Sequence, residues 1–218
     1  MTRTAFDPNF SELPQTLPIF PLPGVLLLPG GRLPLNVFEP RYLAMVRDAI
    51  SGERMIGLIQ PRENGPEAGS AKVYGTGCAG RITAFSETDD GRYLVTLFGL
   101  IRFDVERELP PIDGYRRVLA DYRRFQADLE DAAGEIDRAR LLDTLGTYFD
   151  AAGIEGDWDA IEQTDDERLV TSLAMICPFA ASEKQALLEA MTLPERVETM
   201  TALMEMALHD AHDDTPRH

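Results

Sequence analysis

An acid, a guanidinium and a phenol lie close together around a proline in the segment LPLNVFEPRYLAMV, at positions 33–46. Glu39 and Arg41 could pair with charged groups of a ligand, and Phe38 and Tyr42 could anchor an apolar one. A proline at the first position of a helix explains part of the same pattern, because its missing N–H needs no partner there. The segment therefore predicts either a binding corner or only a helix start, with Glu39 near the positive end of the helix.

The sequence offers no nucleophile and general base at a spacing that would let them act together in catalysis. Ser182 and Lys184 diverge on a helix at spacing i, i+2, and Ser182 is better explained as a helix N-cap. His209, His212 and His218 all lie in an acidic C-terminal tail, where the geometry that proton transfer requires is not held. We therefore predict no catalytic residue, no cofactor and no metal site.

The motif GTGCAG, at positions 75–80, has the glycine spacing of dinucleotide-binding loops. Such a loop needs a helix that begins inside the motif, whereas the β-like segment RITAF follows here. We therefore expect the glycines to mark close backbone packing within a strand. The chain also has no G-x-x-x-x-G-K-[ST] loop, so we predict no ATP hydrolysis.

Up to residue 125, the sequence predicts short strands and one helix, and these elements must position the residues discussed above. Apolar runs such as LPIF, GVLLL and RMIGLIQP are separated by turn signals, and Asp90-Gly91 predicts a hairpin. In YLVTLFGLIRFDVE one parity is apolar, and the other carries polar residues that include Arg102. Phe98 and Leu100 interrupt this polar face, so we expect its middle to be covered. YRRVLADYRRF, at 115–125, predicts a further strand whose arginines stand in solvent beside acids. Many short strands with tight turns indicate a barrel or a folded-over sheet.

Beyond residue 125 the apolar period becomes helical. Capping-box patterns at Thr164 and Ser182 predict two helix starts. Pro178 should end one helix and Pro194 should open the last. Three or four amphipathic helices on a short chain predict a small bundle.

Charge separates the two parts of the 218-residue chain. The formal net charge is −16, and residues 126–218 hold 22 Asp and Glu against six Lys and Arg, so the whole excess lies there. We predict a β-rich subdomain at 1–125, an acidic helical bundle at 126–209 and a flexible tail at 210–218. Most of the acid is interpreted as a solvated surface, and it disfavours binding to nucleic acid because like charges repel.

The two cysteines, Cys78 and Cys177, lie in apolar surroundings and predict buried thiols rather than a disulfide framework. The N-terminal segment MTRTAFDPNFSELPQ lacks the apolar stretch of a signal peptide. The apolar run from Ile19 to Leu28 is interrupted by prolines and is too short to span a bilayer. We therefore predict a cytoplasmic protein that does not enter membranes.

The segment LPIFPLPGVLLLPGGRLPLNVFEPRYLAMVRDAI resembles the opening of the Lon protease N-terminal domain, a substrate-binding domain that also occurs as a stand-alone protein. The likeness continues through YGTGCAGRITAF and YLVTLFGLIRFDV to PFAASEKQALLEAMTLPERVETMTALMEMAL, or from about Leu17 to Leu208. It implies an α+β fold: a PUA-like β-barrel or pseudobarrel with one early helix, followed by a C-terminal helical bundle. The family's ATPase and Ser-Lys peptidase modules have no counterpart in these residues, so we expect no proteolytic activity.

The resemblance also implies a role in recognising protein substrates. We expect a non-catalytic module that binds unfolded or partly apolar polypeptide segments, or a specific protein partner, in a groove on the barrel or between barrel and bundle. The predicted peptide contacts are Phe38, Glu39, Arg41 and Tyr42, all of which could equally be packing residues. Two alternatives stay open: an RNA-binding PUA-like module, whose affinity would fall steeply with salt, and an uncharacterised hydrolase.

Overall fold

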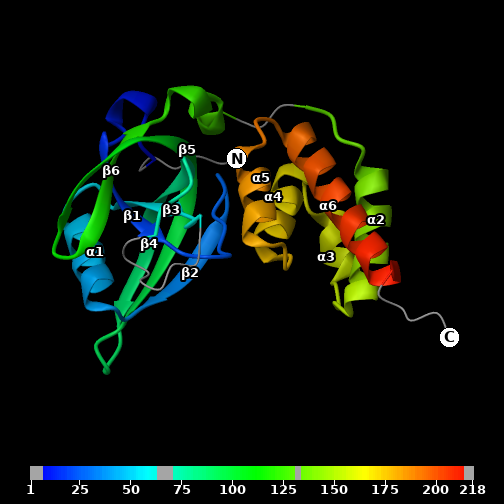
Figure 1. The fold of residues 1–218 in the computed structure, drawn as a ribbon, viewed down its shortest axis with the longest axis horizontal. Helices are drawn as coiled ribbons and strands as arrows, with labels where there is room; N and C mark the ends of the chain where they lie inside the picture. The colour runs from blue at the N-terminus through cyan, green and yellow to red at the C-terminus, as the bar shows by residue number, and fades with distance from the viewer. Residues whose placement is uncertain (1–6, 63–70, 131–133, 214–218) are drawn as a thin grey trace. The chain divides into compact units, whose positions relative to one another are not determined.

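The computed structural model describes residues 7–62, 71–130 and 134–213. The chain divides into two compact units, Met1–Asp131 and Ala132–His218. The described part of the first unit is a sheet with one α-helix, and that of the second consists of helices (Figure 1). Five residues of the predicted tail, 214–218, lie outside the described residues.

The described residues of the first unit form six strands, one α-helix and two 3-10 helices. In chain order these are η1 (Phe10–Glu12), β1 (Thr16–Pro21), β2 (Arg32–Val37), α1 (Pro40–Ser51), β3 (Met55–Ile59), β4 (Thr76–Glu87), β5 (Tyr93–Ile112), β6 (Tyr115–Asp121) and η2 (Arg123–Leu129). The second unit contains α2 (Arg138–Ala152), α3 (Trp158–Gln163), α4 (Asp166–Ile176), α5 (Ala181–Glu189) and α6 (Leu193–Asp213).

The six strands form one mixed sheet in the order β2-β5-β4-β3-β1-β6, and β6 pairs again with β5. The second pairing closes β5, β4, β3, β1 and β6 into a ring, while β2 is attached to β5 alone and remains an edge strand. β1 and β3 run parallel, and the other pairs are antiparallel. The predicted α+β fold, a pseudobarrel with one early helix followed by a helical bundle, is confirmed.

Strand β5 belongs to two different parts of this sheet. Its first half, from Tyr93 to Phe98, lies between β2 and β4, whereas its second half, from Asp104, pairs with β6. The predicted hairpin at Asp90-Gly91 is confirmed, because Glu87 pairs with Tyr93 across the turn and Gly91 has a φ of 78°. In Figure 1 this β4–β5 hairpin extends beyond the rest of the sheet.

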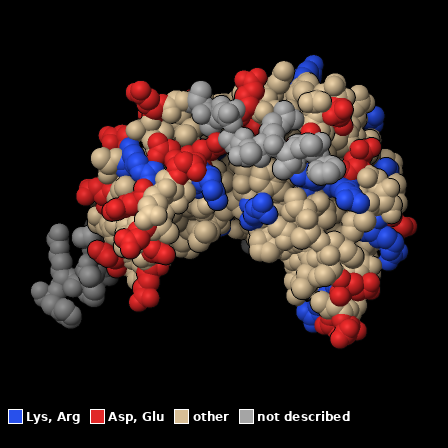
Figure 2. All heavy atoms as spheres, turned by 180° about the vertical axis from the view of Figure 1, so that it is seen from behind, with Lys and Arg blue, Asp and Glu red and all other residues tan. Residues whose placement is uncertain are grey.

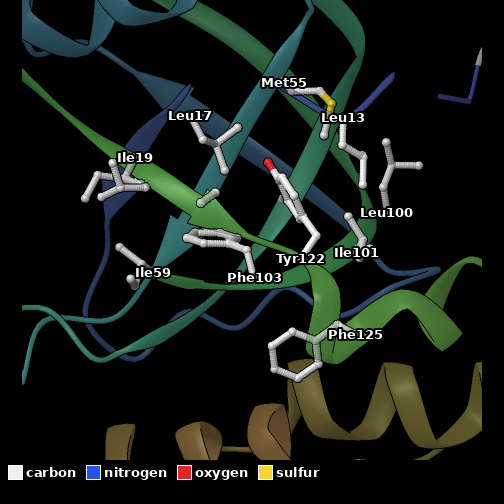
Figure 3. Close-up of a cluster of buried hydrophobic side chains, with 13 residues drawn as sticks. Leu13, Leu17, Ile19, Met55, Ile59, Leu100, Ile101, Phe103, Tyr122 and Phe125 are labelled. Atoms are coloured by element: carbon white, nitrogen blue, oxygen red, sulfur yellow. The ribbon is translucent and has the colours of Figure 1, made fainter. Parts of the chain in front are cut away.

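The ring encloses a core of apolar side chains from several strands (Figure 3). Phe103, Ile101 and Leu17 lie in this core and are fully buried. The glycines of the GTGCAG motif permit this packing, because a Cβ on Gly77 would lie 2.7 Å from both the Phe103 ring and a Leu58 carbonyl oxygen. The prediction of close packing within a strand is therefore confirmed.

One expected strand is a buried loop. The run GVLLL forms no strand, although Leu26, Leu27 and Leu28 are all buried. The loop lies directly against β5, where a Cβ on Gly99 would be 2.0 Å from the Leu28 carbonyl oxygen. The strand prediction was wrong because a short apolar run indicates burial without specifying a ladder.

Arg102 lies on the predicted polar face of β5, whose middle was expected to be covered, and its side chain is 2% exposed. The predicted strand at 115–125 ends at Asp121, and η2 follows it. From η2, Asp128 accepts hydrogen bonds from Nε and Nη2 of Arg102 at 2.9 and 2.7 Å, and Phe125 lies 4.6 Å below the guanidinium. A charge can be buried here because it is paired and hydrogen-bonded.

In the helical unit both predicted capping boxes were wrong in position. Thr164 ends α3, so the N-cap of α4 is Asp165, whose side chain accepts from the Arg168 N–H at 3.0 Å. Helix α5 begins before Ser182, and its N-cap is Ala180. The short helix α3 was not anticipated, and it displaces the start of α4 by one residue.

The two cysteines are buried, as predicted, and burial raises the pKa of the Cys177 thiol to about 11. On the face shown in Figure 2, acidic side chains gather over the helical unit, while basic and acidic ones are mixed over the sheet unit. Within the described residues, no helix combines the length and apolar character needed to cross a membrane.

Candidate functional site: an uncharged groove across three strands

The corner from Phe38 to Tyr42 is the junction between β2 and α1. Glu39 is the N-cap of α1 and Pro40 its first residue, so the predicted helix start is confirmed. Nε and Nη2 of Arg41 donate to Oε2 of Glu39 at 3.0 and 2.8 Å, and the guanidinium lies 4.5 Å from the centre of the Tyr42 ring. The acid and the base therefore satisfy each other within the corner.

The two aromatic side chains of the corner have opposite environments. Tyr42 is 5% exposed, and its ring centre lies 4.1 Å from that of Phe20. Burial raises the pKa of the Tyr42 phenol above its usual value, although the Arg41 guanidinium opposes this shift. Phe38 is 62% exposed, and it is the residue of the predicted set that offers open apolar surface to an approaching chain.

A groove of about 530 Å³ crosses β2, β5 and β4 next to this corner. Residues paired across neighbouring strands project to the same face of a sheet, so the pairings divide the groove lining into two rows of side chains on one face. The first row is Pro34, Thr96 and Ala84, and the second is Asn36, Leu94 and Ser86. Between the rows lies the backbone of Leu35, Val95 and Phe85, which complete the lining. We call this site the sheet groove.

The sheet groove is open to solvent and carries apolar surface at its centre. Leu94 is 45% exposed, Pro34 and Ala84 are also exposed, and Phe38 continues the second row beyond the end of β2. Phe85, 45% exposed, adds apolar surface on the opposite face, where its ring centre lies 5.0 Å from that of Tyr93. Exposed apolar side chains beside an edge strand offer a place where another chain could bind.

No side chain that lines the sheet groove is charged. Its polar groups are the hydroxyls of Ser86 and Thr96 and the amide of Asn36, which are uncharged and can form hydrogen bonds with a peptide backbone. The lining contains no carboxylate, imidazole, thiol or amine that could transfer a proton or attack a substrate. This arrangement suits the binding of an apolar segment by contact.

Three of the four arginines of YRRVLADYRRF pair with local acids, whereas Arg117 donates to the Pro110 carbonyl oxygen at 3.0 Å. Arg116 pairs with Glu108, Arg123 with Asp121, and Arg124 with Asp104 at 3.4 Å. This bears out the expectation that these side chains stand beside acids on the surface. Among the described residues, no three His, Cys, Asp or Glu gather closely enough to hold a metal ion.

Sequence reasoning missed most of the sheet groove. The pattern in β5 contained a signal, since Leu94 lies on the parity that carries polar residues such as Thr96 and is therefore an apolar residue on an outward face. No sequence pattern indicated that Pro34 and Ala84 line the groove. They do so because β2 and β4 pair with β5 on either side.

Comparison with known proteins places the chain in a family. Residues 16–206 match the profile described as the ATP-dependent protease La (LON) substrate-binding domain. The chain belongs to the Lon substrate-binding domain family. This domain is 29% identical over 204 residues to Lon protease 2 of Myxococcus xanthus and, to the same extent, to the Lon protease of Anaeromyxobacter dehalogenans. These alignments cover 90% of the chain but only 24% of either relative.

Solved structures show the same fold as this Lon substrate-binding domain. A Lon N-terminal domain protein from Xanthomonas campestris superposes with a TM-score of 0.63 at 24% identity, covering 86% of this chain and 97% of that one. The N-terminal domain of a Lon protease from the Mycobacterium avium complex gives 0.59 at 16% identity, covering 92% and 100%. At these identities the likeness establishes the fold.

Proposed function

We propose that this protein binds exposed apolar segments of other polypeptides in the sheet groove and does so without covalent chemistry. The observation that carries the proposal is the uncharged, solvent-open lining around Leu94, which continues onto exposed Phe38. Membership of a substrate-binding domain family supports the same class of ligand. In this proposal Glu39, Arg41 and Tyr42 hold the corner in shape, and Phe38 contacts the ligand.

The absence of reactive groups from the groove lining supports a binding role over a hydrolytic one. Three of the four arginines of β6 and η2 pair with acids, which favours a polypeptide ligand over RNA because those three guanidiniums are already engaged. Affinity for an uncharged apolar peptide should therefore depend little on salt concentration, in contrast to binding of a nucleic acid.

Fluorescence anisotropy of a labelled, uncharged apolar peptide tests the proposal on the full chain. Leu94→Ser should weaken binding about tenfold, or about 1.4 kcal/mol, if Leu94 is one of the few central contacts that dominate an interface. Ile176→Ser is the matched control, since Ile176 is 79% exposed but lies in the helical unit. Equal affinities of the two variants and the unaltered chain would contradict the assignment of the groove.

A further inference from the structure

A third row of side chains lies on the same face as the sheet groove. Phe98 pairs with Arg32 of β2 on one side and with Arg81 of β4 on the other. This row is two residues along β2 and β5 from the row of Pro34 and Thr96, a distance of about 7 Å at the usual rise of a strand. Two guanidiniums therefore border one end of an otherwise uncharged groove.

The two arginines differ in what already balances their charge. Arg81 forms an ion pair of 2.9 Å with Asp7, whose carboxylate is 1% exposed. Arg32 is exposed, and in the described part of the chain its only charge-related contact is with the Phe98 ring, 5.7 Å from its guanidinium carbon. Its charge is thus held over an apolar ring but is balanced by no carboxylate of the described residues.

The opposite end of the groove has no comparable positive charge. Arg92 lies over the Phe38 ring at 5.8 Å, but its Nε is 2.8 Å from the Asp90 carboxylate. At the corner, Arg41 is likewise paired with Glu39. The sheet groove therefore has an electrostatic direction, with unbalanced positive charge at the Arg32 end and an aromatic ring at the Phe38 end.

We propose that the sheet groove selects apolar segments that carry a carboxylate at one end, and that Arg32 binds this carboxylate. The inference rests on the proposed function and adds a chemical preference to it. A guanidinium can hold a carboxylate through two parallel hydrogen bonds, and its contact with Phe98 limits the orientations that must be given up on binding. We assign the carboxylate to an Asp or Glu side chain at the end of the bound apolar segment, and the C-terminus of a chain is the alternative that the experiment separates.

A set of labelled peptides that share one uncharged apolar sequence separates these sources. Three of the peptides end in Asp, Asn or Lys and have an amidated C-terminus. The fourth peptide ends in Asn and has a free C-terminal carboxylate. In anisotropy titrations at low salt, the Asp peptide should bind about threefold more tightly than the Asn amide, which is the size of an exposed ion pair. The Lys peptide should bind most weakly, and the difference in affinity between the Asp and Asn amides should shrink at high salt. The free-carboxylate peptide should bind like the Asn amide, and binding as tight as that of the Asp peptide would overturn the assignment to a side chain.

Variants of Arg32 connect the preference to this residue. Arg32→Gln should bind the Asp and Asn amides equally, Arg32→Glu should favour the Lys peptide, and Arg47→Gln, an exposed arginine on α1, should keep the original preference. A reversal in Arg32→Glu cannot arise from partial unfolding, which would weaken all peptides together. Equal binding of all four peptides by the unaltered chain, or a preference that survives Arg32→Gln, would overturn this inference and leave the proposed function standing. Failure of every peptide to bind would overturn both.

Discussion

The two halves of β5 place unexpected residues in opposite environments. In the half that belongs to the ring, the charged side chain of Arg102 is buried and satisfied by Asp128. In the half that lies between β2 and β4, the apolar side chain of Leu94 is 45% exposed. In the ring, a charged side chain is buried because Asp128 pairs with it. In the sheet groove, by contrast, an apolar side chain is exposed to solvent. In the proposed function, the ring is the scaffold and the sheet groove is the surface that binds the peptide.

Removal of the partner of Arg102 should give the largest effect. Asp128→Ala leaves a buried guanidinium without a carboxylate, which should lower the free energy of unfolding by about 3–5 kcal/mol. Glu108→Ala removes the partner of Arg116 from a pair whose carboxylate is 45% exposed, and should cost at most about 1 kcal/mol. Urea denaturation followed by circular dichroism measures both, and similar losses would mean that Arg102–Asp128 is not a buried structural pair.

The corner residues should separate into packing and contact roles. Tyr42→Ala should cost about 3 kcal/mol of stability, because it removes a buried ring from beside Phe20. Phe38→Ala should change stability by no more than about 0.5 kcal/mol, while it weakens binding of the apolar peptide. Thermal unfolding and anisotropy on the same samples test this division. A large loss of stability in Phe38→Ala with unchanged peptide affinity would reverse the assignment.

A smaller effect on stability should appear at alkaline pH, where a tyrosine of β6 ionises. Burial, and then the hydrogen bond that Tyr115 donates to Asp48 at 2.8 Å, raise the pKa of the Tyr115 phenol from 10.0 to about 12. A pKa that is higher in the folded state means that the contribution of this phenol to stability is complete below pH 10 and is lost as the pH rises through 12. Tyr115→Phe cannot ionise, so its melting temperature should decline less between pH 10 and 11.5. Parallel declines for both proteins would contradict this assignment.

Sequence reasoning predicted the parts of the fold that depend on local chemistry. The helix start at Pro40, the hairpin at Asp90-Gly91 and the close packing of Gly77 all follow from single residues and their backbone preferences. The faces of β5 were harder to assign, because its pairing with β4 shifts register between Gly99 and Ile101. A bulge of this kind exchanges the two faces of a strand, and no apolar alternation reveals it in advance.

The same limitation explains why none of the predicted site residues lines the sheet groove, although Phe38 follows its residue Asn36 by two positions. The corner was visible as a run of five consecutive residues, whereas the sheet groove is assembled from three strands whose neighbours are set by the whole topology. Arg32 and Arg81, far apart in the chain, become members of one row only through their common partner Phe98. A site defined by cross-strand pairing requires the register, which local patterns do not contain.

Site-specific photo-crosslinking tests the central claim most directly. A photoreactive phenylalanine derivative replaces Leu94 in one variant and Ile176 in a matched variant, and each is irradiated with the same apolar polypeptide. The sheet groove predicts a crosslinked product from position 94 in several-fold excess over position 176, and competition by unlabelled peptide at position 94. Equal yields at the two positions, or a product confined to position 176, would contradict a binding site on the open half of β5.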